Sequence, residues 1–141
     1  MRIDDVPQDK GMIDNDNLRE ICYAVNPEGR YVLAASAGWE PKNIANSQAW
    51  ELVRETVLDI WSKVRAGKLS PLAYHMARNQ MNVGLLAKYV RYSRLRVWCH
   101  LKPAGFRRLP PDILSRYATV FDLEIDALQQ VPDNAQELMP I

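Results

Sequence analysis

Hydrophobic residues recur at steps of three and four between Ser47 and Ala66, which is the period of one helical face. Gly67 follows, and glycine commonly occupies the position after the last helical residue. The pattern therefore predicts a long amphipathic helix whose apolar stripe consists of Trp50, Val53, Val57, Ile60, Trp61 and Val64. This helix would either cover its neighbours in the fold or form a dimer interface, and the pattern leaves both roles open.

The helical period returns in two short runs, 83–90 and 94–102, on either side of Arg91-Tyr92-Ser93. Ser93 is a good N-cap residue for the second run. The small side chain of Ala87 would allow the first helix to approach the second closely, with Val97 opposite it. Two short helices joined by a tight turn in this way predict a helix-turn-helix.

Further short helices are predicted on both sides of this pair. Ser70-Pro71 supplies an N-cap and a first-turn proline for a helix before it. After it, Pro111-Asp112 starts a helix that would bury residues up to Phe121, and Glu124–Gln130 forms a last helix that ends before Pro132. The segment then contains five short helices, and the helix after the tight turn is the third.

Near the N-terminus, Glu20–Val25 and Arg30–Ser36 are rich in β-forming residues and enclose Asn26-Pro27-Glu28-Gly29. This predicts a β-hairpin whose one face carries Ile21, Tyr23 and Val25 with Tyr31 and Leu33 of the return strand. Because an isolated hairpin is marginally stable, it must pack on a helix or pair across a dimer. Residues 1–17 are polar and Asp-rich, and they are predicted to form a disordered or loosely attached arm.

Between Ser70 and Val131 the chain resembles the lambda-repressor-like (Cro/XRE) helix-turn-helix DNA-binding family. The resemblance is carried by LLAKYV-RYS-RLRV and by DILSRYATVFDLEIDALQQV. It departs from the family at Arg91, where the family usually has a turn glycine, at Val83, where it usually has glutamine, and at His100-Leu101. A non-glycine residue in that turn would be strained by about 1 kcal/mol. The resemblance implies a five-helix DNA-binding domain that acts as a homodimer on double-stranded DNA, most plausibly in transcriptional regulation.

Together these predictions describe a mainly α protein: an N-terminal β-hairpin and long amphipathic helix followed by a five-helix lambda-repressor-like domain. The arm would span residues 1–17, the hairpin and long helix 18–67, the DNA-binding domain 68–132 and a tail 133–141. Gly67-Lys68 is the expected boundary between the two halves.

The distribution of charge supports a polyanionic partner for the second half. Residues 63–120 contain twelve Lys or Arg and a single acid, Asp112, whereas the segments on both sides are net acidic. The whole chain has a formal charge of only +1. A positive field concentrated on one segment favours binding to nucleic acid, although an arginine-rich solvated surface is the simpler alternative.

The resemblance places the first residues of the third short helix against the major groove. Arg94 is then suited to a bidentate contact with guanine, and Leu95 to a thymine methyl group. Trp98 has two possible positions, exposed beside the DNA or packed inward on Phe106 or the long helix, and we favour packing. We expect His75 and His100 to be packed structural histidines. The predicted DNA-binding residues are Arg91, Ser93, Arg94, Leu95, Arg96, Trp98, Cys99, Lys102, Arg107 and Arg108.

Other classes of function find little support in the sequence. The two histidines have no acid or cysteine at metal-ligand spacing, and no glycine-rich phosphate loop or nucleophile elbow is present. We therefore expect no enzyme activity, metal or cofactor. Two isolated cysteines and the absence of a long apolar run favour a soluble cytoplasmic protein. The alternative function is docking of an acidic protein partner by a helix-turn-helix that no longer binds DNA.

Overall fold

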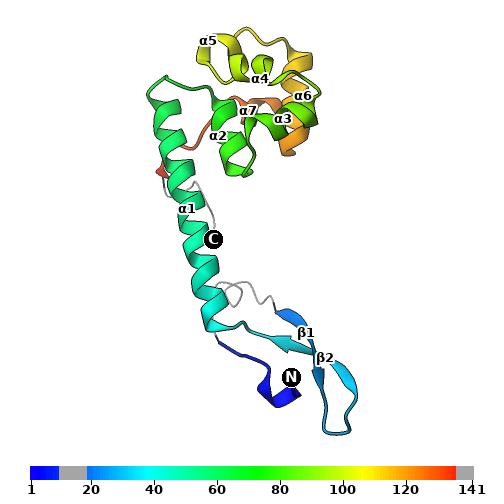
Figure 1. Ribbon diagram of the computed structural model, residues 1–141. Helices are drawn as coiled ribbons and strands as arrows, with labels where there is room; N and C mark the ends of the chain where they lie inside the picture. Colours follow the sequence, from blue (N-terminus) through cyan, green and yellow to red (C-terminus); the bar gives the residue numbers. More distant parts are fainter. Residues whose placement is uncertain (10–18, 136–141) are drawn as a thin grey trace. The chain divides into compact units, whose positions relative to one another are not determined.

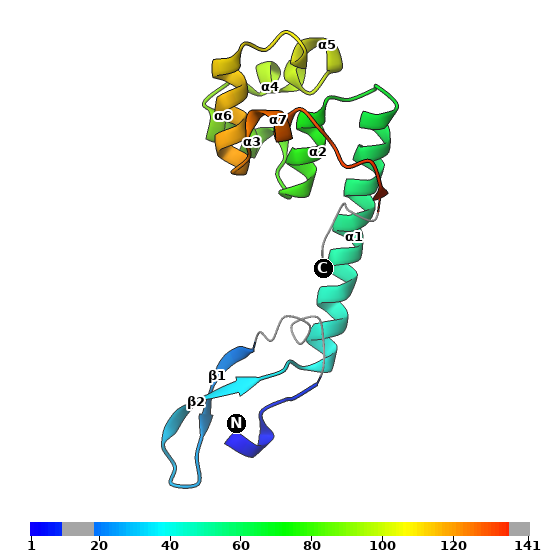
Figure 2. The same cartoon turned by 180° about the vertical axis from the view of Figure 1, so that it is seen from behind.

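The computed structural model describes residues 1–9 and 19–135, and these residues form two compact units. The first ends at Glu51 and the second begins at Leu52. The described residues contain seven α-helices and one two-stranded antiparallel sheet, so the predicted mainly helical fold with an N-terminal hairpin is confirmed. Figure 1 labels these elements, and Figure 2 gives the view from behind. None of the described helices is long and apolar enough to cross a membrane.

The sheet is the predicted hairpin, formed by β1 (Glu20–Val25) and β2 (Tyr31–Ser36). Its register pairs Tyr23 with Leu33 at the centre. The turn closes through a hydrogen bond from the Gly29 N–H to the Asn26 carbonyl, 2.9 Å. Gly29 has φ +77°, a conformation that glycine adopts without a steric penalty.

The first nine residues are attached to this hairpin, which differs from the predicted loose arm. Arg2 forms a parallel bridge with Val25, and Gln8 forms one with Gly38. Val6, between Asp5 and Pro7, is buried. The polar composition suggested disorder, but backbone pairing and one buried valine suffice to order the segment. The rest of the predicted arm, residues 10–17, lies outside the described residues.

Helix α1 (Glu40–Arg65) begins well before the predicted start at Ser47. The carboxylate of Asp9 accepts a hydrogen bond from the Glu40 N–H at 2.9 Å, so a residue distant in sequence satisfies an N–H at the helix start. Proline is tolerated in the first turn of a helix, so Pro41 lies within α1 without interrupting it. The helix ends at Arg65, one residue before the predicted end, and Gly67 follows with φ +71°.

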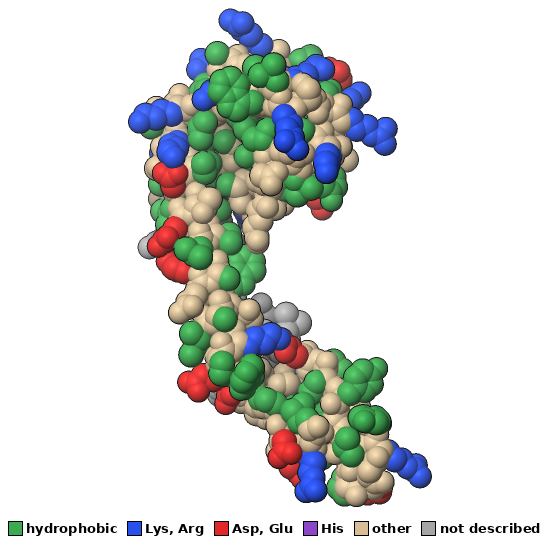
Figure 3. Space-filling model, viewed as in Figure 1, with side chains coloured by type: hydrophobic (Ala, Val, Ile, Leu, Met, Phe, Trp, Pro, Cys, Tyr) green, Lys and Arg blue, Asp and Glu red, His purple; other side chains and the backbone are tan. Residues whose placement is uncertain are grey.

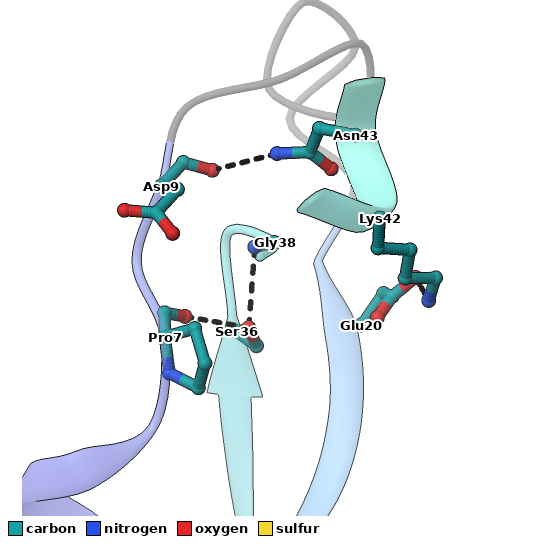
Figure 4. A network of polar contacts seen from close by, with 7 residues as sticks. All are labelled: Pro7, Asp9, Glu20, Ser36, Gly38, Lys42 and Asn43. Atoms are coloured by element: carbon teal, nitrogen blue, oxygen red, sulfur yellow. Dashed lines mark hydrogen bonds and ion pairs between the residues drawn. The ribbon is translucent and has the colours of Figure 1, made fainter. Parts of the chain in front are cut away.

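Figure 4 shows the polar network that joins these parts of the first unit. The Ser36 hydroxyl donates to the Pro7 carbonyl at 2.6 Å and accepts from the Gly38 N–H at 3.1 Å. The Asn43 side-chain amide of α1 donates to the Asp9 carbonyl at 3.3 Å. An ion pair between Lys42 and Glu20 links α1 to β1. The N-terminal segment, the hairpin and the start of α1 are therefore one hydrogen-bonded assembly.

The second unit contains six helices after α1, one more than predicted. The helix predicted over 94–102 ends earlier, at His100, and Pro103 starts an additional short helix with Lys102 as its N-cap. The helices are α2 (Pro71–Arg78), α3 (Val83–Val90), α4 (Arg94–His100), α5 (Pro103–Phe106), α6 (Pro111–Phe121) and α7 (Ile125–Leu128). Their shared core includes Leu72, Leu86, Ala87, Val97, Leu114, Tyr117 and Leu128.

The second half of α1 packs on these helices, so the predicted boundary at Gly67-Lys68 is wrong. Val57 of α1 is fully buried against Tyr74 of α2. The indole N–H of Trp61 donates to the Pro132 carbonyl at 2.8 Å, and Arg65 pairs with Asp133 at 2.9 Å. The role of this half of the helix as a cover is therefore observed. The first residue of the predicted tail, Asp133, is held to α1 by its ion pair with Arg65. Residues 136–141 lie outside the described residues.

Four of the described helices end in the same way, with a left-handed residue and the paired backbone hydrogen bonds of a Schellman motif. At α1 the left-handed residue is Gly67, but at α2, α3 and α6 it is Gln80, Arg91 and Asp122. At α3 the Tyr92 N–H reaches the Ala87 carbonyl at 3.0 Å. Arg91 has φ 58° and ψ 44°, which is the strained conformation predicted for a non-glycine residue in this turn.

Relief of this strain gives a first prediction. A side chain in the left-handed region costs roughly 1–2 kcal/mol, and the larger entropy of glycine in the unfolded chain offsets part of that gain. Arg91→Gly should therefore raise the free energy of unfolding by about 0.5–1 kcal/mol, measured by urea denaturation. Gly67→Ala is the matched control and should lower it by a similar amount. A loss of stability in Arg91→Gly would contradict the assigned strain.

Candidate nucleic-acid interface

Two side-chain caps and one turn fix the orientation of α4. The Asn82 side chain accepts from the Leu85 N–H at 2.9 Å and caps α3. The Ser93 hydroxyl accepts from the Arg96 N–H at 3.2 Å and caps α4, as predicted. Ala87 of α3 and Val97 of α4 are both buried and belong to the same hydrophobic core. This packing determines which α4 side chains face outward.

The outward face of α4 is apolar at its centre. Leu95 is 71% exposed and Trp98 is 52% exposed, and Cys99 beside them is also exposed. The preferred inward packing of Trp98 is therefore wrong. Because Val97 fills the inner face, the next residue is rotated by about 100° toward the outside. The Lys102 ammonium lies 4.9 Å from the centre of the Trp98 ring, within the range of a cation–π contact.

Arg94 lies at the start of this face and reaches back over α3. A Cβ atom added to Gly84 would be 3.4 Å from the Arg94 guanidinium carbon, and 3.3 Å from the Asn82 side-chain oxygen. The guanidinium therefore lies over the first turn of α3. The positive end of the α3 dipole and the Arg94 charge are directed at the same region, which makes this region suited to an acceptor or an anion.

A second cationic group forms around Tyr92, at the turn. The Arg96 guanidinium lies 4.1 Å from the Tyr92 ring centre, and the Arg116 guanidinium of α6 lies 5.5 Å from it. The Arg96 side chain is thus directed toward Tyr92. Arg116 was not among the predicted site residues. Its place beside Tyr92 depends on the packing of α6, and no local sequence signal could have indicated it.

The remaining predicted residues lie before and after α4 in the chain. Arg91 occupies the turn before it, Lys102 caps α5, and Arg107-Arg108 follow α5; all four side chains are exposed. Within residues 1–9 and 19–135, no acidic side chain forms an ion pair with any Lys or Arg from Lys68 to Arg116. Positive charge in this part of the molecule is therefore available to an external partner.

A buried polar pair supports α4 from behind. His100 Nδ1 lies 2.8 Å from the Tyr117 hydroxyl, and the Ser70 hydroxyl donates to the His100 carbonyl at 2.9 Å. Burial lowers the pKa of His100, and the nearby Arg96 charge lowers it further. His75 Nε2 lies 3.0 Å from the Gln130 carbonyl, and burial likewise lowers the pKa of this residue. Both histidines are packed, as expected.

The arrangement presents cationic groups around an exposed apolar centre. A ligand that binds here would find positive charge, hydrogen-bond donors and an apolar surface. Within the described part of the chain, no three His, Cys, Asp or Glu side chains come together in a way that could hold a metal ion. Comparison with protein-family models, curated proteins and solved structures found no match to this chain.

The buried histidines generate a second prediction. An unfolded histidine titrates near pH 6.5, and the folded pKa of His100 is lower. Below about pH 6.5 the unfolded chain therefore binds more protons than the folded one. The free energy of unfolding should fall as the pH decreases from 7 through the region between the two pKa values.

His100→Gln should remove part of this pH dependence, with His75→Gln as the matched variant for the other buried ring. Urea denaturation at several pH values between 5 and 7.5 measures the slope. Equal slopes for His100→Gln and the unsubstituted protein would show that His100 is not buried in its neutral form.

Proposed function

We propose that this chain binds specific sequences in double-stranded DNA through α4, as a homodimer, and acts in transcriptional regulation. In this proposal α2–α7 are a lambda-repressor-like helix-turn-helix domain with one additional short helix. One observation carries it above the others: the exposed face of α4 begins with Arg94, whose guanidinium lies over the first turn of α3. Both positive features would meet the DNA where the helix enters the groove.

Electrostatics support an extended polyanion. Figure 3 shows Lys and Arg side chains distributed over the helical unit, with hydrophobic side chains between them. Because the described acids do not neutralise these groups in ion pairs, each can take the place of a counterion at a DNA phosphate. The lysines and arginines would then supply affinity that does not depend on sequence and falls with salt concentration.

Sequence selection would come from the start and centre of α4. Arg94 can donate two hydrogen bonds to guanine, the commonest specific contact in the major groove. Leu95, which is exposed beside it, can contact a thymine methyl group. Ser93, Lys102, Arg107 and Arg108 are better suited to phosphates, which set the register of the protein on DNA. The pair of guanidinium groups at Tyr92 adds a further phosphate site.

A homodimer would place two copies of α4 about one helical turn of DNA apart, roughly 34 Å. A single short helix contacts few base pairs, so a two-fold arrangement increases both affinity and specificity. A palindromic binding site is the consequence to expect.

The exposure of Leu95 and Trp98 favours a second candidate, the docking of an acidic protein. Two large apolar side chains surrounded by cations resemble the centre and rim of a protein interface. Val83 and Arg91, which replace the glutamine and glycine usual in the family, favour the same alternative. DNA remains the primary proposal because the cations extend over several elements beyond α4.

Fluorescence anisotropy with duplexes from the region upstream of the protein's own gene tests the primary proposal. Arg94→Ala should weaken the preferred duplex by about 5- to 150-fold, the equivalent of 1–3 kcal/mol, and reduce the preference among duplexes. Lys102→Ala should weaken all duplexes to a similar extent and reduce the dependence on salt. Arg30→Ala, an exposed arginine of the hairpin turn, is the matched control and should change neither.

The salt series separates the remaining outcomes. Binding that survives moderate salt and prefers one duplex supports a specific reader. Binding that ignores sequence and disappears with modest salt is the general attraction of a cationic surface. Absence of binding at low salt rules out the DNA proposal and leaves the acidic protein as the candidate partner.

A further inference from the structure

One face of the β1–β2 hairpin is apolar, uncharged and exposed. Strand alternation and register put six residues on this face, with the central pair formed by Tyr23 and Leu33. The six residues are Ile21, Tyr23, Val25, Tyr31, Leu33 and Ala35. None of them carries a charge. We call this set the hairpin face. Figure 3 shows hydrophobic side chains gathered over the hairpin in the lower part of the view.

The residues on the opposite face of the hairpin are covered. Ala24 is fully buried, and Ser36 is buried where its hydroxyl bonds the Pro7 carbonyl. The hydrogen bond from Ser36 places Pro7 on this side, and Arg2 and Gln8 bridge to Val25 and Gly38. The larger side chains are thus on the uncovered side, which reverses the usual arrangement of a sheet with one packed face.

The amount of exposed surface is large for a unit of this size. Tyr23 is 74% exposed and Tyr31 79%, while Ile21 and Leu33 are each 65% exposed. An aromatic side chain has an area of about 150–250 Å². The two tyrosines, together with the smaller Ile21 and Leu33, therefore leave about 500 Å² of mostly apolar surface in water. A patch of that size equals the largest found on a typical monomer and commonly marks an interaction site.

We infer that the occupant of the hairpin face is the hairpin face of a second copy of this chain. A two-fold interface brings each patch against itself, so it must be self-complementary, and an apolar patch without charges meets this condition. The exposed hydrophobic residues of α1 meet this condition less well, because charged residues lie among them. Glu51 precedes the exposed Leu52, and Arg54 and Glu55 come two and three residues after it.

Two hairpins would stack face to face about 10 Å apart, with Tyr23 and Leu33 nearest the two-fold axis. The pair would bury about 1,000 Å² in total, which is the lower limit for a specific interface. We therefore expect a dimer with a dissociation constant in the micromolar range. The inference rests on the proposed function in one respect: a palindromic DNA site requires two copies of the chain, and this interface would hold them together. It can be tested without DNA.

A charge exchange at Leu33 tests the arrangement with the full chain. Leu33→Lys places two ammonium groups together in a symmetric dimer and Leu33→Glu two carboxylates, so each variant alone should sediment as a monomer. An equimolar mixture of the two should form a heterodimer, because opposite charges then meet at the axis. Both substitutions are at an exposed side chain, and circular dichroism confirms that the variants are folded.

Leu95→Lys is the matched control, since Leu95 is similarly exposed but belongs to α4. It should leave the dimer unchanged in sedimentation velocity from 1 to 200 µM, run without DNA. Three results would each overturn the inference. The unsubstituted protein could remain a monomer at all concentrations, Leu52→Lys could dissociate the dimer while Leu33→Lys does not, or the mixture of charged variants could stay monomeric. A dimer that meets these expectations but binds no duplex would leave the inference intact and refute the DNA proposal.

Discussion

The tight turn between α3 and α4 is the constraint on which the helical unit depends. Arg91 takes a left-handed conformation there, and the cap at Ser93 then starts α4 at a fixed angle. Ala87 of α3 and Val97 of α4 both belong to the buried core of this unit. With Val97 on the inner side, α4 completes the core with its inner positions, and the intervening positions, including Trp98, are left in contact with solvent.

Several features of this surface are unfavourable for stability alone. Arg91 is strained, large apolar side chains are exposed on α4, and the cations nearby have no described acidic partners in ion pairs. Strained residues and exposed apolar groups are often found where a protein binds a partner. Glycine at position 91 would relieve the strain but remove a positive charge from the turn. The presence of arginine there is consistent with a role for that charge in binding.

The sequence predicted those features that depend on nearby residues. The hairpin turn, the Ser93 cap and the end of α1 just before Gly67 all follow from local backbone preferences and from short-range patterns. Features that depend on distant residues were missed or wrong. Asp9 determines where α1 starts, and the burial of Tyr74 against α1 determines where the units divide. Likewise, Arg116 reaches the site only through the packing of α6, and Trp98 faces outward because other side chains already fill the core.

The most direct test of the central claim, that α4 is the surface in contact with DNA, uses the four tryptophans of the chain. Their indole N–H groups give separate resonances in ¹⁵N NMR, and Trp98→Phe identifies the one from α4. On addition of duplex from the upstream region at near-physiological salt, the Trp98 resonance should shift or broaden, while that of Trp39 in the first unit should remain in place. An unchanged Trp98 resonance at saturating duplex would contradict the account.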